Sequence, residues 1–236
     1  LDKKGAITTD NSYFKAEADN DPMGFLGDYL KKYDARGEGL FCLITGNHDC
    51  KRTSFNLTDK ERKLAYAFLL TMPGAPFLYY GDEIGMAYRW LPTKEGGYHR
   101  TGSRTPMQWD NGRNLGFSTA EAGDLYLPVD PNPGNTTVES QEADPASMLN
   151  HVRSVLALRR QEKDLGNYSS FSVYHAQEGD RLLAYKRGDL LLAVNPGLEG
   201  KTLALDGAYE AIFTFGQAEV EGKTLTLGAQ SFVVLK

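Results

Sequence analysis

The sequence has few cysteines, no long apolar run and no block of one charge. Two cysteines, Cys42 and Cys50, are too few for the disulfide framework of a small secreted protein, so we expect free thiols and a cytoplasmic location. No apolar run approaches the roughly 18 residues of a membrane-spanning helix, so membrane insertion is not expected. The 26 basic and 31 acidic residues are mixed along the chain, which argues against a nucleic-acid partner.

The first two thirds of the sequence alternate between helix and strand patterns. Apolar residues at three- and four-residue spacing predict helices at 22–37, 58–72 and 145–159. Two short, continuous apolar runs, at 40–44 and 77–80, are typical of strands that are buried on both faces of a parallel sheet. This alternation predicts an α/β fold. The interval 84–143 is long and polar, and loops of that length are usually functional or contain small elements.

The last seventy or so residues change to a different pattern. Short β-like runs separated by turn signals predict an antiparallel sheet or sandwich. The runs are 171–176, 181–187, 190–195, 201–205, 209–215, 223–227 and 231–236. We therefore expect two domains, residues 1–166 and residues 167–236.

Two parallel strands cannot form a covered sheet or a closed barrel, because parallel strands need sheet neighbours and helices on both faces. We expect the sheet to continue in residues outside this sequence. The first fifteen residues also contain no initiator methionine and no apolar signal segment. A chain with only these strands is expected to pair with the missing segment or to associate with itself through exposed strand edges.

A polar triplet, Asn47-His48-Asp49, directly follows the first apolar run. In (β/α)8 barrels the C-terminal ends of the strands form the active-site face. A carboxylate beside an imidazole can bind adjacent hydroxyls of a sugar and favour positive charge at the anomeric carbon. Local pattern alone equally allows a structural role, with His48 bonded to the backbone and Asp49 capping a loop.

The wider context of this triplet resembles a known family. The segments FCLITGNHD, APFLYYGDEIGM, SRTPMQWD and NLGFST, in this order, resemble the α-amylase superfamily (glycoside hydrolase family 13). They are similar to the seventh and eighth strands of its barrel with their loops. The stretch 103–110 is similar to the branch that holds oligo-1,6-glucosidases, α-glucosidases and trehalose synthases. The resemblance implies the C-terminal part of a (β/α)8 TIM barrel, followed by an antiparallel all-β domain.

The resemblance also implies roles for individual residues. Asp49 would bind sugar hydroxyls and stabilise the oxocarbenium-like transition state, and His48 would hydrogen-bond the same sugar. Asn47 would organise the loop, and Arg104 would reach the non-reducing end of an α-linked glucose oligosaccharide. The nucleophilic aspartate and the acid/base glutamate precede residue 1 in the family's order, so the chain alone would be an inactive fragment. A calcium ion, where the whole protein has one, would lie in the missing half; no metal or cofactor is expected in this chain.

The sequence leaves alternative interpretations of the function and of several individual residues. A non-catalytic relative that acts as a partner or carbohydrate-binding subunit is the alternative function. Asp82 and Glu83 could bind substrate, although structural ion pairing is favoured. Trp90, Tyr98 and Trp109 could stack on sugars or pack the loop. The spacing of the potential zinc ligands does not support a metal site; these are Cys42, His48, Asp49, Cys50 and His99. The charges in the segment RRQEKD are expected to be solvated.

Overall fold

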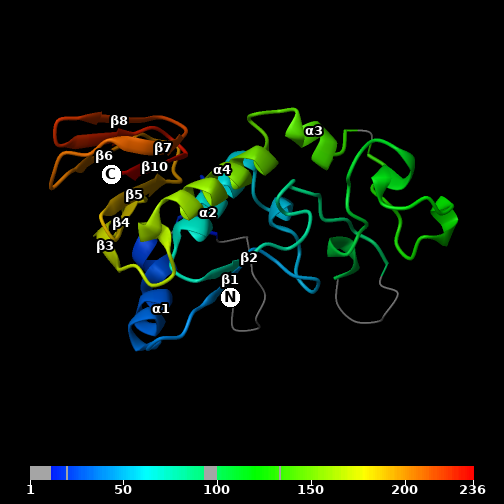
Figure 1. The fold of residues 1–236 in the computed structure, drawn as a ribbon, viewed down its shortest axis with the longest axis horizontal. Helices are drawn as coiled ribbons and strands as arrows, with labels where there is room; N and C mark the ends of the chain where they lie inside the picture. Colours follow the sequence, from blue (N-terminus) through cyan, green and yellow to red (C-terminus); the bar gives the residue numbers. More distant parts are fainter. Residues whose placement is uncertain (1–11, 20, 93–99, 133) are drawn as a thin grey trace. The chain divides into compact units, whose positions relative to one another are not determined.

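The computed structural model describes residues 12–19, 21–92, 100–132 and 134–236 (Figure 1). The described chain divides into two compact units, which we treat separately. The first contains residues 44–59, 77–92, 100–132 and 134–154. The second contains residues 12–19, 21–43, 60–76 and 155–236. The domain boundary at residue 166 stays a prediction.

Three helices lie where the apolar spacing predicts them, namely α1 (Pro22–Ala35), α2 (Asp59–Thr71) and α4 (Met148–Gln161). At the start of α1 the Asp21 side chain accepts a hydrogen bond from the Gly24 amide at 2.8 Å. The predicted start of α4 at Pro145 is wrong, because Asp144 holds a turn ahead of the helix and Ser147 accepts a hydrogen bond from the Asn150 amide. In the described part of the chain, no helix has both the length and the apolar composition that crossing a membrane requires.

Strands β1 (Cys42–Ile44) and β2 (Ala75–Phe77) form a two-stranded sheet. The Ala75 amide donates to the Phe41 carbonyl, and the Thr45 amide donates to the Phe77 carbonyl. The bonded pairs advance in the same direction along both strands, which is the parallel arrangement. The second strand lies at Ala75–Phe77 and not at the predicted 77–80. The prediction that these strands are buried on both faces is wrong for the described chain, since Ile44 and Phe77 are exposed. Within the residues that the structure describes, this sheet has only two strands.

The interval 84–143 contains short elements of its own. They are η3 (Thr101–Ser103), η4 (Arg113–Gly116), η5 (Ala122–Asp124) and α3 (Val138–Glu142). Thr137 and Ser140 form a capping box at the start of α3. Ile84, Met86, Met107 and Leu149 form a buried apolar cluster against which Val138 packs. The interval is therefore anchored by a small core in the first unit.

The C-terminal segment folds into two antiparallel sheets, as the turn spacing predicts. The five-stranded sheet has the order β3-β4-β5-β10-β7, and the three-stranded sheet has the order β6-β9-β8. The strands are β3 (Phe171–Ala176), β4 (Leu183–Arg187), β5 (Leu190–Asn195), β6 (Lys201–Ala204), β7 (Ala211–Phe215), β8 (Ala218–Glu221), β9 (Thr224–Leu227) and β10 (Ser231–Leu235). All seven predicted strands are confirmed. Strand β8 was not predicted, because two of its four residues are glutamates that alternate with Ala218 and Val220.

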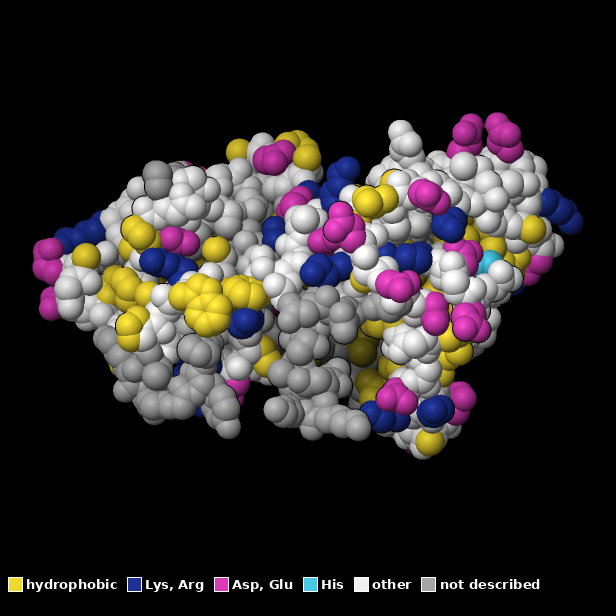
Figure 2. Space-filling model, turned by 180° about the vertical axis from the view of Figure 1, so that it is seen from behind, with side chains coloured by type: hydrophobic (Ala, Val, Ile, Leu, Met, Phe, Trp, Pro, Cys, Tyr) yellow, Lys and Arg dark blue, Asp and Glu magenta, His cyan; other side chains and the backbone are white. Residues whose placement is uncertain are grey.

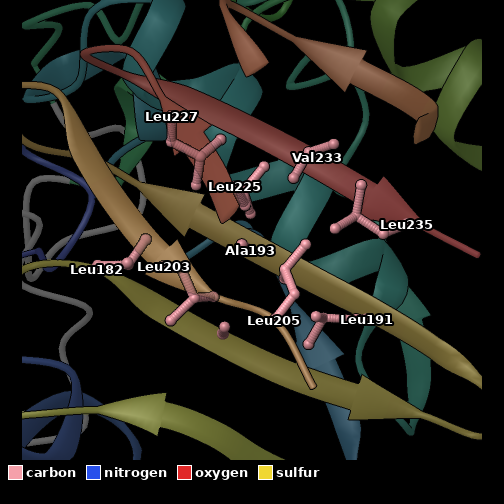
Figure 3. Packing of buried hydrophobic residues seen from close by; sticks show 10 residues of the cluster. Leu182, Leu191, Ala193, Leu203, Leu205, Leu225, Leu227, Val233 and Leu235 are labelled. Carbon is pink, nitrogen blue, oxygen red and sulfur yellow. The ribbon is translucent and has the colours of Figure 1, made fainter. Parts of the chain in front are cut away.

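Apolar side chains from both sheets form one buried cluster (Figure 3). Leu191 and Val233 come from the larger sheet, and Leu203, Leu225 and Leu227 come from the smaller one. Leu225 and Leu227 are two residues apart, so they point to the same face of β9, whereas the alternating Thr224 and Thr226 are exposed. The buried leucines of β9 join the cluster shared by both sheets, so the segment is a two-layer β structure.

The segment RRQEKD is not uniformly solvated, contrary to the expectation. The Arg159 guanidinium donates to the Leu70 carbonyl at 2.5 Å, to the Met72 carbonyl at 3.0 Å and to the Gly74 carbonyl at 2.9 Å. These carbonyls end α2 and lead into β2. A cation at this position satisfies carbonyl oxygens that have no partner within the helix. It also interacts favourably with the negative end of the helix dipole. Arg159 therefore fixes the connection between α2 and β2.

Arg159→Lys is expected to lower the free energy of unfolding by about 1–3 kcal/mol, because an ammonium group cannot reproduce a fork of charged hydrogen bonds to three carbonyls. Arg160→Lys is the matched control, since Arg160 is the exposed neighbour on the same helix. Urea unfolding followed by circular dichroism measures both. Equal stability of the two variants would contradict the role given to Arg159.

Candidate active site

The loop that follows β1 holds the triplet Asn47-His48-Asp49 in a tight turn. The Asn47 side-chain oxygen accepts a hydrogen bond from the Asp49 amide at 2.8 Å. The Cys50 amide donates to the Asn47 carbonyl at 3.3 Å. An asparagine side chain that bonds the backbone two residues on is a common way to stabilise such turns. The turn places Asp49 just beyond the C-terminal end of the strand.

Three cationic or polar groups surround the Asp49 carboxylate. Oδ1 accepts hydrogen bonds from Arg104 Nη2 at 3.0 Å and from Arg100 Nη1 at 3.3 Å. Oδ2 lies 3.3 Å from His48 Nε2. The Asp49 side chain is half exposed. The structure therefore brings three of the predicted site residues, Asp49, His48 and Arg104, into direct contact.

The pKa of Asp49 is lowered by these neighbours. Partial desolvation opposes ionisation, but His48 and the hydrogen bonds from Arg104 and Arg100 outweigh it. The carboxylate is therefore ionised at neutral pH and retains solvent access. It can accept further hydrogen bonds or lie against a developing positive charge, and it is too weak a base to collect a proton near neutrality.

Arg100 is a site residue that the sequence analysis missed. The short helix η3 lies between Arg100 and Arg104, and this turn brings the two guanidinium groups to the same carboxylate oxygen. Arg104 also donates through Nε to the His48 carbonyl at 2.9 Å. A second arginine four residues before Arg104 in the same polar loop is the sequence signal that would have identified Arg100.

Beneath the loop lies an ion pair that solvent does not reach. Arg52 and Asp82 are each 1% exposed, and Arg52 Nη1 lies 3.2 Å from Asp82 Oδ1. Arg52 also donates to the Tyr80 carbonyl at 2.7 Å and to the Ser103 carbonyl at 3.0 Å. The other Asp82 oxygen accepts from the Thr45 hydroxyl at 2.9 Å. Asp82 thus has the structural ion pair that the sequence analysis favoured over substrate binding.

A cavity of about 440 Å³ opens beside Arg104. Its lining includes the aromatic side chains of Trp109, Phe117 and Tyr126, each about half exposed, and the side chain of Glu83. Burial raises the pKa of Glu83 despite hydrogen bonds from backbone amides. The Oε2 atom of Glu83 is buried and has no hydrogen-bond partner in the described chain.

The remaining candidate residues do not join the Asp49 cluster. Trp90 makes edge contacts with Phe55 and Tyr88 and is 60% exposed. Tyr98 and His99 lie outside the described residues. Cys42 and Cys50 are free thiols. Across the part of the chain that the structure describes, no three histidine, cysteine or acidic side chains are grouped as metal ligands would be.

Comparison with known proteins gives consistent results. The family described as "Alpha amylase, catalytic domain" matches residues 26–167. The trehalose synthase/amylase TreS of Mycobacterium tuberculosis is 40% identical over 170 residues, 64% of this chain and 26% of that protein. The trehalose synthase of Thermus thermophilus is 37% identical over 194 residues, 75% of this chain and 19% of that protein. The chain thus spans about a quarter of the length of the curated relatives it matches.

Solved structures show the same fold. The trehalulose synthase MutB of Pseudomonas mesoacidophila aligns with a TM-score of 0.74 at 21% identity, over 93% of this chain and 47% of that chain. Such neighbours are TIM-barrel enzymes of glycoside hydrolase family 13. The family match covers more than half of the sequence. The chain therefore belongs to the α-amylase family, glycoside hydrolase family 13, and its relatives include proteins named trehalose synthase, α-glucosidase and oligo-1,6-glucosidase.

Proposed function

We propose that this chain is the C-terminal part of a retaining enzyme that cleaves or transfers α-glucosidic bonds in oligosaccharides. The observation that carries the proposal is the ionised Asp49 carboxylate at the end of β1, flanked by His48 and Arg104. Family membership supports the reaction class. Curated relatives named trehalose synthase and oligo-1,6-glucosidase support an α-linked glucose oligosaccharide as the substrate class.

Asp49 acts in this proposal as an electrostatic and hydrogen-bonding group. Its Oδ1 atom takes both arginine hydrogen bonds, whereas Oδ2 faces His48 and keeps acceptor capacity for sugar hydroxyls. A fixed negative charge near the anomeric carbon stabilises an oxocarbenium-like transition state without moving a proton. His48 and Arg104 would hold the hydroxyls of the same sugar, while Asn47 maintains the turn.

Retaining hydrolysis also requires a nucleophile and an acid/base, two carboxyl groups about 5–5.5 Å apart across the bond that is cleaved. Asp82 cannot supply either group, because it is buried in the pair with Arg52. Backbone amides bind Glu83, which lines the neighbouring cavity. We therefore propose that residues outside this sequence supply both groups and that the chain alone is inactive.

The purified chain is expected to release no nitrophenol from p-nitrophenyl α-glucoside and no glucose from maltotriose. The Asp49→Asn variant serves as the control and should give the same baseline. Turnover by the unmodified chain that Asp49→Asn abolishes would contradict the proposal, since a complete catalytic set would then lie within this sequence. Turnover that the variant retains would identify a contaminant.

The Asp49 carboxyl group is expected to titrate below the ordinary range of an aspartate, which carbon-13 NMR of its carboxyl carbon can measure. Arg104→Gln should raise this pKa, because it removes a charged hydrogen bond to Oδ1. Arg113→Gln is the control, since Arg113 in the same unit pairs with Glu121 instead. An Asp49 pKa that is unchanged by Arg104→Gln would contradict the described geometry.

The sign of the pH dependence follows from the same shift. The pKa of Asp49 is lower in the folded state than in the unfolded state, so its ionised form favours folding above the unfolded pKa. That contribution is lost as the pH falls through the folded pKa. In Arg104→Gln the loss should begin at a higher pH.

The exposed strands support a proposal about assembly. Ile44 is 39% exposed and Phe77 is 54% exposed, although both belong to a parallel sheet. One face of the molecule shows hydrophobic side chains at the surface among charges of both signs (Figure 2). Exposed apolar strands with unpaired edges tend to acquire partners. We infer that further barrel strands complete this sheet in the whole protein, and that the isolated chain associates with itself.

Sedimentation velocity of the isolated chain is expected to show species larger than one copy, with a fraction that rises with concentration. Combining Ile44→Thr with Phe77→Thr should lower that fraction, because the substitutions make the exposed strand surface polar. Tyr168→Thr is the control, since Tyr168 is 78% exposed and lies outside the two-stranded sheet. A strictly monomeric chain over the whole concentration range would contradict the inference.

A further inference from the structure

We propose that Arg52, through its buried pair with Asp82, is a positioning residue that holds the Asp49 loop and the Arg100–Arg104 turn in register. The inference rests on the proposed function, because it concerns the same site. Nothing in the sequence pattern singles out Arg52, which is one of many charged side chains in polar loops.

Arg52 follows Asp49 by three residues, so the two share one short loop. From this loop the guanidinium reaches two other segments. It donates to the Tyr80 carbonyl and pairs with Asp82 in the segment after β2, and it donates to the Ser103 carbonyl within η3. A single buried cation therefore joins the three segments that carry the site. Each contact is at or below 3.2 Å.

The hydrogen bond from Arg52 to the Ser103 carbonyl connects Arg52 to the turn that carries Arg100 and Arg104. Ser103 is fully buried and lies between Arg100 and Arg104. Its carbonyl accepts from Arg52 and from the Tyr79 hydroxyl, and its own hydroxyl donates to the Cys50 carbonyl at 2.6 Å. Because Cys50 directly follows Asp49, the turn that carries the arginines is bonded to the loop that carries the carboxylate.

Gly81, which lies against the Arg52 guanidinium, has no space for a side chain. Gly81 has φ +81°, in the left-handed region that favours glycine, and a Cβ there would lie 2.3 Å from the Met86 sulfur and 3.1 Å from Arg52 Nη1. On the other side, the Thr45 hydroxyl fixes the second Asp82 oxygen and accepts from the Tyr79 amide at 3.1 Å. The pair is thus held from several directions and cannot shift without moving the loop.

Energetics favour a positional role over a purely stabilising one. Desolvating two charges costs as much as their attraction returns in many proteins, so apolar residues of similar size often replace buried pairs without loss of stability. Arg52 also leaves its Nε atom buried without a hydrogen-bond partner in the described chain. The pair fixes the positions of the loops that carry the site. This matters because catalytic groups are sensitive to displacements of about 1 Å.

Arg52→Lys tests the proposal in this chain, because it keeps the positive charge and removes the guanidinium fork that reaches two other segments. The readout is the pKa of Asp49, from carbon-13 NMR with the signal identified by its loss in Asp49→Asn. We expect the pKa to rise toward the ordinary value of an aspartate, since Arg100 and Arg104 would no longer be held on Oδ1. Because the substitution keeps a positive charge at position 52, a change of charge cannot cause this rise in the Asp49 pKa.

Arg187→Lys is the matched control. Arg187 is also fully buried and donates to backbone carbonyls, those of Thr71 and Gly166 in the second unit. It should lower the thermal unfolding midpoint and leave the pKa of Asp49 unchanged. A milder second variant, Ser103→Ala, removes the hydroxyl bonds to the Cys50 and Arg100 carbonyls but keeps the Ser103 carbonyl that accepts from Arg52, so it should raise the Asp49 pKa less than Arg52→Lys. It covers the case in which Arg52→Lys does not fold.

An Asp49 pKa that stays low in Arg52→Lys, or in Ser103→Ala where that variant alone folds, would overturn the inference. An equal rise in Arg187→Lys would also overturn it, because loosening of the whole chain would then be the cause. These outcomes are separate from failure of the proposed function. No turnover is measured, and the unmodified chain first establishes whether the Asp49 pKa is low at all.

Discussion

Arg52 and Asp82 lie 3.2 Å apart where solvent does not reach, and the geometry of the candidate site depends on them. Their hydrogen bonds connect the loop after β1, the segment after β2 and the turn η3. Parallel strands place their C-terminal ends at one edge of a sheet, but this alone does not set the distances between the loops that follow. The buried pair sets those distances for the first unit.

The charges of the site therefore form two layers with different physical roles. The lower layer is dry, so its ion pair is costly to bury and intolerant of a missing partner. The upper layer, with Asp49, Arg100 and Arg104, is partly exposed, and solvent weakens each of its interactions. The upper layer is exposed enough to exchange its contacts for those of a ligand, whereas the lower layer is buried.

Sequence patterns predicted the parts of the fold in which burial and periodicity coincide. Leu225 and Leu227 alternate with exposed threonines, so the strand could be recognised from its own residues. The strands near Ile44 and Phe77 have the composition of a buried parallel sheet, yet both side chains are exposed, because the described residues give this sheet only two strands. The Asn47–Asp49 loop was found from its position after a strand. Arg52 and Arg100 were missed because only folding brings their side chains to Ser103 and Asp49.

Asp49 illustrates how much of a proposed function one segment can carry. The groups that form its loop and lower its pKa all lie within the first unit. Asn47, Arg52 and Ser103 belong to residues 44–59 and 77–154. A group that stabilises charge needs only a fixed position and solvent access. A nucleophile and an acid/base need a fixed separation from each other across the substrate, and a closed barrel provides that by joining distant strands. An electrostatic group of this kind can therefore be positioned within one unit, whereas a nucleophile and acid/base pair depends on strands that the whole barrel joins.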